Sequence, residues 1–406
     1  MIQFLDLLIW LYLVAIAPKL LWDRIVRGKK HPALLQRLGR NLPPADRVIW
    51  VHAVSVGEVK AAAPLLQELK RRVPNTFLLL TTTTATGYAE AQKLLSNPNA
   101  IAYAPVDLSW VVQKWVAHFQ PTHFFLIESD FWPQLLFTLK NQGTTTFLVS
   151  GKLSPRSASR WARLAPLAKR LFAQFDAIFV QNEEHYKRFL PLVSSPGRLH
   201  VTGNLKWDIT PRQVVLSSWQ KELLPLSILT LSCTHPQEEM MLLNALENTS
   251  WFIILAPRHP ERFEEVAHHL AERKIPYFRW TQPEQRRGGE RVLLVDTMGS
   301  LPECYALSQC VLVAGSYIAS IGGHNLLEPC LYGAPVIFGP HTWGQTEFAI
   351  KIIEAGAGSC VLADQLPLFL HTFPEKKEAM QTAAKHLAQQ GSQVAYNTLQ
   401  KTDLVT

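Results

Sequence analysis

Glu58 is the first acidic side chain in a position to do chemistry. It ends the string Val51 to Glu58, where an apolar run closes and a helical pattern opens. A carboxylate half-buried at a helix start has its pKa raised by loss of water and can accept a proton from an attacking hydroxyl. The alternative is structural, because Ser55 and Glu58 have the spacing of a capping box. The sequence therefore predicts either a general base or a helix cap here.

Glu128 and Lys206 are two further candidates in the same half of the chain. Glu128 follows an aromatic and apolar run, where a charge is costly unless it is paired or functional. Its alternative role is an ion pair with a nearby arginine. Lys206, in the string Gly203 to Lys206 at an expected domain junction, can meet a leaving phosphate or a developing negative charge. Its alternative is an exposed linker lysine. Asp130 is interpreted as a helix cap rather than a metal ligand.

The second half of the sequence has polar turns after four successive apolar runs. Each is a weak signal, but the carboxyl ends of parallel strands meet at one edge of a sheet, so together they predict a nucleotide pocket. In the last turn, glycines before a helix start are expected to offer free backbone N–H groups to an anion. Asn325 can add a side-chain amide, and Glu328 can accept from ribose hydroxyls. The four turns are Ser232 to His235, Pro257 to Pro260, Thr297 to Ser300 and Gly322 to Pro329.

The elements that must position these residues alternate regularly. Apolar runs of four to eight residues alternate with amphipathic helical patterns from Arg47 to Gln181 and again from Ile228. This pattern predicts βαβ units and parallel sheets. The polar, proline-containing stretch 203–227 between them is interpreted as an interdomain linker. The fold class is therefore α/β, with two Rossmann-like domains of the GT-B glycosyltransferase type, an interdomain cleft, and ligands at the carboxyl ends of the strands.

The predicted domain boundaries follow from these patterns. Residues 1–31 are a membrane anchor and basic connector, residues 32–210 an acceptor-binding domain, and residues 211–406 a donor-binding domain. The apolar stretch Ile2 to Trp22 is about long enough for a single membrane-spanning helix. Positive charges follow it, which favours an uncleaved anchor with the domains on the cytoplasmic side. A cleaved signal peptide and an amphipathic surface helix are the alternatives.

Composition narrows the class of partner. The net charge is +8, and a basic surface suits nucleic acid, anionic lipid or a phosphorylated substrate. No nucleic-acid-binding signature, zinc spacing or other metal cluster is present, so we expect neither nucleic acid nor a metal, and no cofactor. The five cysteines form no C-x-x-C pair and are typical of a reduced compartment.

These motifs, taken in order, resemble those of the 3-deoxy-D-manno-octulosonic acid (Kdo) transferases of bacterial lipopolysaccharide biosynthesis. The resemblance covers nearly the whole chain. It implies an inverting, metal-independent glycosyltransferase of the cell inner membrane. It also implies CMP-Kdo as the donor and a lipid A precursor (lipid IVA) or Kdo-lipid intermediates as the acceptor. The segments that carry it are His52 to Glu58, Glu128 to Pro133, Gly203 to Lys206, Pro257 to Pro260, Met298-Gly299 and Gly322 to Pro329.

The resemblance also implies roles for individual residues. By position, Glu58 matches the general base, and Glu128 and Lys206 match the transition-state stabilisers. A further set matches the segments that bind CMP: Pro257, Arg258, Met298, Gly299, Ser300, Asn325, Leu326, Leu327 and Glu328. The turn Ser232 to His235 departs from the family pattern, which has glycines around the Thr-His pair, and so does Gly344-Gln345.

Two other functions stay open on the residues alone. One is a UDP-sugar-dependent glycosyltransferase or epimerase of the same architecture. A single compact phosphate turn favours CMP over UDP, because CMP carries one phosphate. The other is an inactive, membrane-tethered scaffold that keeps the fold.

Overall fold

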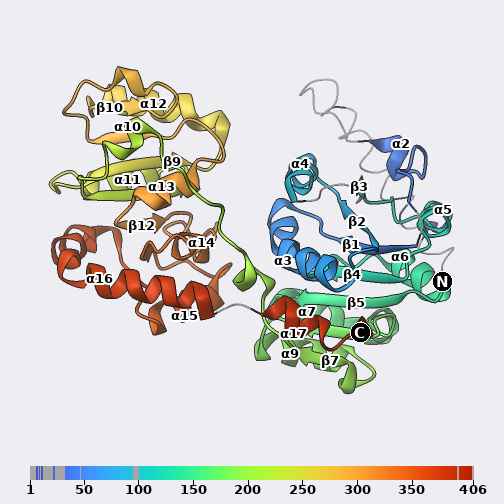
Figure 1. Ribbon diagram of the computed structural model, residues 1–406. Helices are drawn as coiled ribbons and strands as arrows, with labels where there is room; N and C mark the ends of the chain where they lie inside the picture. The colour runs from blue at the N-terminus through green and yellow to red at the C-terminus, as the bar shows by residue number, and fades with distance from the viewer. Residues whose placement is uncertain are drawn as a thin grey trace. The chain divides into compact units, whose positions relative to one another are not determined.

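The computed structural model describes residues 33–45, 47–94, 100–390 and 393–404, together with residues 6, 7, 9, 11 and 22. The chain divides into two compact units. Unit 1 comprises Met1–Ile209 and Gln393–Thr406, and unit 2 comprises Thr210–Ser392. Figure 1 shows that each unit is built around its own sheet, with helices packed against both faces. Both sheets have seven strands and are parallel throughout, as predicted.

The sheet of unit 1 has the strand order β3-β2-β1-β4-β5-β6-β7. Its central strands are buried along their length, which is why they read as unbroken apolar runs rather than as alternating patterns. The strands are β1 (Val48–His52), β2 (Phe77–Thr82), β3 (Ala100–Tyr103), β4 (His123–Ile127), β5 (Thr145–Gly151), β6 (Ala177–Val180) and β7 (Leu199–Val201).

The helices of unit 1 follow from the crossover rule for parallel strands. On one face of the sheet, Trp50 stacks on Trp115 with ring centroids 5.7 Å apart and meets Phe124 edge-on at 5.5 Å. The helical segments are α2 (Leu34–Arg37), α3 (Val56–Arg72), α4 (Ala85–Leu94), α5 (Ser109–Phe119), α6 (Pro133–Asn141), α7 (Pro155–Arg163), α8 (Ala165–Phe172), α9 (Glu183–Phe189), η1 (Leu190–Leu192), η2 (Pro196–Arg198), η3 (Leu205–Asp208) and α17 (Val394–Leu399).

Unit 2 repeats the plan with the strand order β10-β11-β9-β8-β12-β13-β14. The strands are β8 (Ile228–Thr234), β9 (Phe252–Pro257), β10 (Tyr277–Arg279), β11 (Val292–Leu294), β12 (Cys310–Val313), β13 (Val336–Phe338) and β14 (Gly358–Cys360). The helical segments are α10 (Ser218–Lys221), α11 (Glu238–Ala245), η4 (Pro260–Arg262), α12 (Phe263–Glu272), η5 (Pro283–Gln285), α13 (Leu301–Leu307), α14 (Leu327–Leu331), α15 (Thr346–Glu354), η6 (Ala363–Gln365) and α16 (Leu366–Gln390).

The structure corrects the expected domain boundary at the C-terminus. The sequence placed all of 211–406 in the second domain, but residues 393–404 belong to unit 1, where α17 packs on α3. The carboxylate of Asp208 accepts hydrogen bonds from the backbone N–H of Gln393 (2.9 Å) and of Ala395 (2.7 Å). The stretch interpreted as a linker also begins inside unit 1, since Leu205 and Trp207 are buried there.

Most of the predicted membrane anchor, Ile2 to Trp22, lies outside the described residues. Within it, Asp6 accepts hydrogen bonds from the backbone N–H of Ser109 (2.8 Å) and from the amide of Gln134 (2.9 Å). Among the described residues, no helix combines the length and apolar character needed to cross a bilayer.

Candidate functional site

Glu58 and Glu128 lie at the point in the sheet of unit 1 (sheet 1) where the strand order reverses direction. From β1 the chain first adds β2 and β3 on one side, and it then returns to add β4 and the later strands on the other side. Ligands of open α/β sheets bind outside the carboxyl ends of the strands at such a point. Glu58 follows β1 and Glu128 follows β4, so the topology places both predicted carboxylates at this position.

Glu58 lies in the first turn of α3 and is held by its own helix start. Ser55 is the N-cap, and its hydroxyl accepts from the backbone N–H of Glu58 at 3.4 Å. The carboxylate of Glu58 accepts in turn from the backbone N–H of Val54 at 2.8 Å. The carboxylate also accepts from the hydroxyl of the capping residue Ser55 at 3.4 Å. The structural role predicted for the Ser55–Glu58 pair is therefore present, with Val54 supplying the backbone N–H that the carboxylate binds.

The electrostatic surroundings of Glu58 suit a base that works near neutral pH. Burial raises the pKa of its carboxyl from 4.5 to about 7, and the negative charge of Glu128 adds to the rise. The hydrogen bond from Val54 and the charge of Lys152 act in the opposite direction. A pKa near the working pH is where general acid–base catalysis is most efficient. Capping and proton transfer are thus compatible in one side chain.

Glu128 is almost fully buried, at 3% exposure, and pairs with two lysines; the alternative weighed from the sequence was a pair with an arginine. Its carboxylate lies 2.9 Å from Nζ of Lys206 and in contact with Nζ of Lys152. Burial alone would raise the pKa of Glu128, but the two ammonium groups outweigh it and hold the pKa below its ordinary value. Glu128 is therefore an anion that fixes two cations at the edge of the sheet.

Backbone conformation at the end of β4 and β5 shows that this cluster is imposed by the fold. Glu128 has φ 66° and Ser150 has φ 55°, a region that non-glycine residues occupy at a cost and that is enriched at functional sites. The hydroxyl of Ser150 accepts from the backbone N–H of Leu205 at 3.3 Å, beside Lys206. Asn204 accepts from the backbone N–H of Lys206 at 3.1 Å. Lys206 is thus positioned by buried polar contacts and is not a free linker residue.

Lys152 is the residue that the sequence analysis missed. It stands directly after β5, as Glu128 stands directly after β4, and its backbone N–H donates to the carbonyl of Glu128 at 3.2 Å. Its position could have indicated a site residue, because Lys152 follows β5 and Glu128 follows β4, and these two strands are neighbours in the sheet.

The predicted cap role of Asp130 is wrong. Helix α6 begins after Trp132, and the carboxylate of Asp130 accepts from the indole N–H of Trp132 at 3.3 Å. Asp107 performs the capping instead, because its carboxylate accepts from the backbone N–H groups of Gln134 (3.1 Å) and Leu135 (2.8 Å). Asp107 lies between β3 and α5, 27 and 28 residues before the N–H groups that it binds, so this contact has no local sequence signal.

In unit 2 the winding reverses between β8 and β12, and three of the predicted turns meet there. His235 follows β8, and its ring stacks on that of His324 with the two Nε2 atoms 2.7 Å apart. Arg258 follows β9 and its backbone N–H donates to Thr234 at 3.0 Å. Burial, together with the charges of His235 and Arg258, lowers the pKa of His324 to about 4. Burial also lowers the pKa of His235. The two stacked histidines are therefore neutral near pH 7, while Arg258 supplies positive charge.

The backbone N–H groups expected to bind an anion are partly occupied. The buried carboxylate of Glu238 accepts from the backbone N–H groups of Gly315 (2.8 Å), Tyr317 (3.2 Å) and His235 (3.1 Å). The N–H of Gly323 donates to the carbonyl of Gly315. Glu238 therefore shapes the turn itself, and side chains carry more of any ligand binding than the glycine pattern suggested.

Asn325 and Glu328 lie at the start of α14, a helix of only five residues. The side-chain oxygen of Asn325 accepts from the backbone N–H of Leu327 at 3.1 Å, which fixes the side chain at the start of the helix. The charge of Glu328 reaches Tyr305 on α13 and Tyr332, and adds to the burial that raises the pKa of each. Leu326, next to Asn325 in the chain, is fully buried.

Pro257 and the turn Met298 to Ser300 complete the predicted donor set. Pro257 ends β9 and is buried, whereas the side chain of Met298 is exposed. Gly299 has φ 89°, and its carbonyl accepts from the guanidinium of Arg212 at 3.5 Å. The same guanidinium pairs with Glu303 on α13. This turn is therefore fixed to the start of α13, on the side where Glu328 lies.

Gly322 can be tested as a structural requirement of this site. It has φ 81°, and a Cβ there would meet the ring of Trp343 at 2.2 Å. The ring is itself held by a hydrogen bond from its indole N–H to the carbonyl of Ala319 at 2.9 Å. We expect Gly322→Ala to lower the free energy of unfolding by about 1–3 kcal/mol, because it adds backbone strain and a steric overlap. Urea denaturation measures this loss, and Gly288→Ala, with φ 83° and no neighbour within 4 Å, is the control for φ alone.

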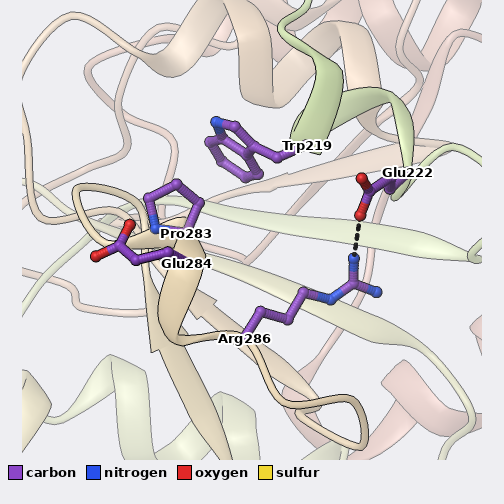
Figure 2. Close-up of a pocket in the computed structure, with 5 residues that line it drawn as sticks. All are labelled: Trp219, Glu222, Pro283, Glu284 and Arg286. Atoms are coloured by element: carbon purple, nitrogen blue, oxygen red, sulfur yellow. Dashed lines mark ion pairs between the residues drawn. The ribbon is translucent and has the colours of Figure 1, made fainter.

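A surface pocket elsewhere in unit 2 contains none of the predicted site residues. Figure 2 shows its lining, which includes an ion pair between Arg286 and Glu222. The guanidinium nitrogen and the carboxylate oxygen of this pair are 3.5 Å apart. The other lining residues are Trp219, Pro283 and Glu284. Within the part of the chain that the structure describes, no group of three or more His, Cys, Asp or Glu side chains is arranged to hold a metal ion.

Comparison with known proteins gives three kinds of match. The family model described as 3-deoxy-D-manno-octulosonic-acid transferase (kdotransferase) matches residues 32–209. The 3-deoxy-D-manno-octulosonic acid transferase of Chlamydophila psittaci is 30% identical over 386 residues, which cover 92% of this chain and 89% of that protein. The transferase of the same name from Bordetella pertussis is 32% identical over 406 residues, covering 93% and 91%.

Among solved structures, a glycosyltransferase from Rickettsia africae has a TM-score of 0.60 at 12% sequence identity, covering 87% of this chain and 97% of that one. At this identity the likeness shows the fold alone. It supports the GT-B-type arrangement of an α/β chain with two parallel sheets.

Proposed function

Because this chain belongs to the family of 3-deoxy-D-manno-octulosonic acid transferases, we propose that it transfers Kdo from CMP-Kdo to a lipid A precursor, lipid IVA, or to a Kdo-lipid intermediate. The observation that carries the proposal is Glu58, a carboxylate with a pKa of about 7 beside the Glu128–lysine cluster at the reversal point of sheet 1. The transfer is one step of lipopolysaccharide biosynthesis.

In the proposed reaction, Glu58 takes the proton of an acceptor hydroxyl. The hydroxyl oxygen then attacks the anomeric carbon of Kdo from the face opposite the phosphate, so the bond to CMP breaks and the configuration inverts. CMP leaves with the bonding electron pair. Ammonium groups aimed at the place where negative charge develops stabilise the transition state. Lys206 is the candidate for that role, with Lys152 beside it, and Glu128 holds both in place. No metal ion is assigned a role in this reaction.

Unit 2 is proposed to hold the donor. Arg258 offers a planar, charged donor to the CMP phosphate or to a carbonyl of the base. The side chains of Asn325 and Glu328 suit polar groups of the nucleotide. The remaining residues of the set line the turns at the same edge of the sheet: Pro257, Met298, Gly299, Ser300, Leu326 and Leu327.

The acceptor is a lipid, so we propose that the protein works at the cytoplasmic face of the bacterial inner membrane. Residues 2–22 are the proposed anchor, and the basic residues that follow it suit an anionic leaflet. A wholly periplasmic protein, detected by a reporter fusion, would contradict this orientation.

Arg258→Ala is expected to weaken CMP binding by about 10- to 100-fold, because a charge-assisted hydrogen bond is lost. Isothermal titration with CMP measures the change. Arg287→Ala, which removes an exposed arginine elsewhere in unit 2, is the matched control and should bind as the parent does.

Titration with CMP and UDP on the parent chain separates the two nucleotide classes. Tighter binding of CMP is expected. Tighter binding of UDP would favour the UDP-sugar enzyme instead. Binding of CMP with no product from CMP-Kdo would favour the inactive scaffold.

A further inference from the structure

Helices α7 and α8 of unit 1 have an unusual charge pattern. From Pro155 to Phe172 the sequence contains five basic residues and no acidic residue. All five side chains are exposed, and within the described part of the chain none forms an ion pair with a carboxylate. The five residues are Arg156, Arg160, Arg163, Lys169 and Arg170.

Large apolar side chains lie among these cations. Leu164, between the two helices, is 53% exposed, and Leu167 on α8 is 38% exposed. Leu190 on η1, a segment that packs on both helices, is 39% exposed. The core of the unit is filled by other residues of α8, namely Ala168, Leu171 and Phe172. The three leucines lie outside this core and expose apolar surface to solvent.

Neighbouring acidic residues do not neutralise this area. Helix α9, which packs on α7 (Figure 1), carries Glu183 and Glu184 but also Lys187 and Arg188, so its two negative and two positive charges cancel. Glu184 is already paired with Arg188. The five charges of α7 and α8 remain in excess.

We propose that the outer surface of α7, α8 and η1 docks on an anionic lipid bilayer. Exposed leucines surrounded by Arg and Lys are the composition of helices that lie in a membrane interface, where apolar side chains enter the headgroup boundary and cations meet anionic lipid. Charge complementarity selects the bilayer as the partner. The surface is distinct from residues 2–22, and a second contact of this kind converts weak membrane association into stable association.

The surface is also connected to the candidate site. Helix α7 begins three residues after Lys152, which pairs with Glu128. The hydroxyl of Ser154 accepts from the backbone N–H of Ser157 at 3.1 Å and fixes the helix start. A bilayer bound here would bring a lipid-borne acceptor to the edge of sheet 1. This last step rests on the proposed function, whereas the docking itself does not.

The test is flotation of the full chain with vesicles of phosphatidylcholine, with and without phosphatidylglycerol. Leu164→Asp with Leu167→Asp is expected to weaken binding to the anionic vesicles by about tenfold or more, since apolar insertion is replaced by repulsion. Arg160→Glu with Arg163→Glu is expected to weaken it by about 25-fold or more. Added salt should weaken binding of the parent. The replaced side chains are exposed, and thermal unfolding checks that the variants fold.

The matched control is Ile350→Asp with Ile353→Asp on α15. These two side chains are 50% and 49% exposed and have the same spacing of three residues, but they lie in unit 2. Vesicle binding equal to that of the parent is expected. Unchanged binding in both surface variants would overturn the proposal. So would a parent chain that binds neutral vesicles as tightly as anionic ones and does so independently of salt. Loss of RNA binding in these variants, with vesicle binding intact, would reassign the surface to nucleic acid.

Failure of docking and failure of the proposed function are distinguishable. Glu58→Gln should bind vesicles as the parent does. The surface variants should keep sugar transfer to a detergent-dispersed acceptor and lose it on vesicles. A chain that binds anionic vesicles through this surface but never transfers sugar would refute the function and leave the docking surface standing.

Discussion

Replacing Glu58 by glutamine is expected to lower kcat for sugar transfer by about 100- to 10,000-fold, the usual contribution of a general base. Glutamine keeps the shape of the side chain and can still accept from the backbone N–H of Val54, but it cannot take a proton from the acceptor. CMP affinity, measured by titration, should stay unchanged, because every predicted CMP residue lies in unit 2. Transfer at the parent rate would remove Glu58 from the mechanism.

The pH dependence gives this variant a second signature. Glu58 must be ionised to act, and its pKa is raised to about 7. In the parent, kcat/KM should therefore fall as the pH drops through about 7. The residual activity of Glu58→Gln should not show this fall.

Stability should show the reverse trend. A raised pKa means that the folded state favours the protonated carboxyl. The contribution of Glu58 to the free energy of unfolding is therefore complete below the unfolded pKa and is lost as the pH rises through about 7. Glu58→Gln should therefore raise the melting temperature more at pH 8 than at pH 5. An equal shift at both pH values would show that the carboxylate is not destabilised by its surroundings.

Lys206→Ala has the second largest expected effect. A loss of about 100- to 1,000-fold in kcat is expected, which is the range for removing one preorganised electrostatic group. Stability should fall as well, because Glu128 is 3% exposed and would keep only Lys152 as a counter-charge. Lys60→Ala, on the exposed side of α3, is the control for loss of a lysine.

A double variant separates the two consequences of losing Lys206. In Glu128→Gln with Lys206→Ala the buried charge is gone, so much of the stability should return while activity stays low. If activity returned together with stability, Lys206 would have only a structural role.

The fold was predictable because its elements are strongly patterned. Buried central strands such as β1 and β4 read as continuous apolar runs, and the helices between them are amphipathic. The helical pattern from Ala158 to Gln174 forms parts of two helices, α7 and α8, because Pro166 lies in the first turn of α8, where its missing N–H costs nothing. Strands β7, β10 and β14 were not predicted, because each has only three residues and lies at an edge of its sheet.

The part of the candidate site that could be predicted consists of charged residues that follow the carboxyl ends of strands. Glu58, Glu128 and Lys206 are brought together with Lys152, whose role emerges only when β4 and β5 lie side by side. The use of Glu238 to bind the backbone of Gly315 and Tyr317 depends on contacts 77 and 79 residues apart, which no local pattern contains. The catalytic and CMP-binding roles and the interdomain cleft stay predictions.

The most direct measurement is mass spectrometry of the lipid product formed by the purified chain from CMP-Kdo and lipid A precursor. We predict that the parent adds one or more Kdo residues to the precursor and that Glu58→Gln, folded and able to bind CMP, adds none in the same time. A parent chain that leaves the precursor unmodified, or a Glu58→Gln variant that modifies it at the parent rate, would contradict proton abstraction by this carboxylate.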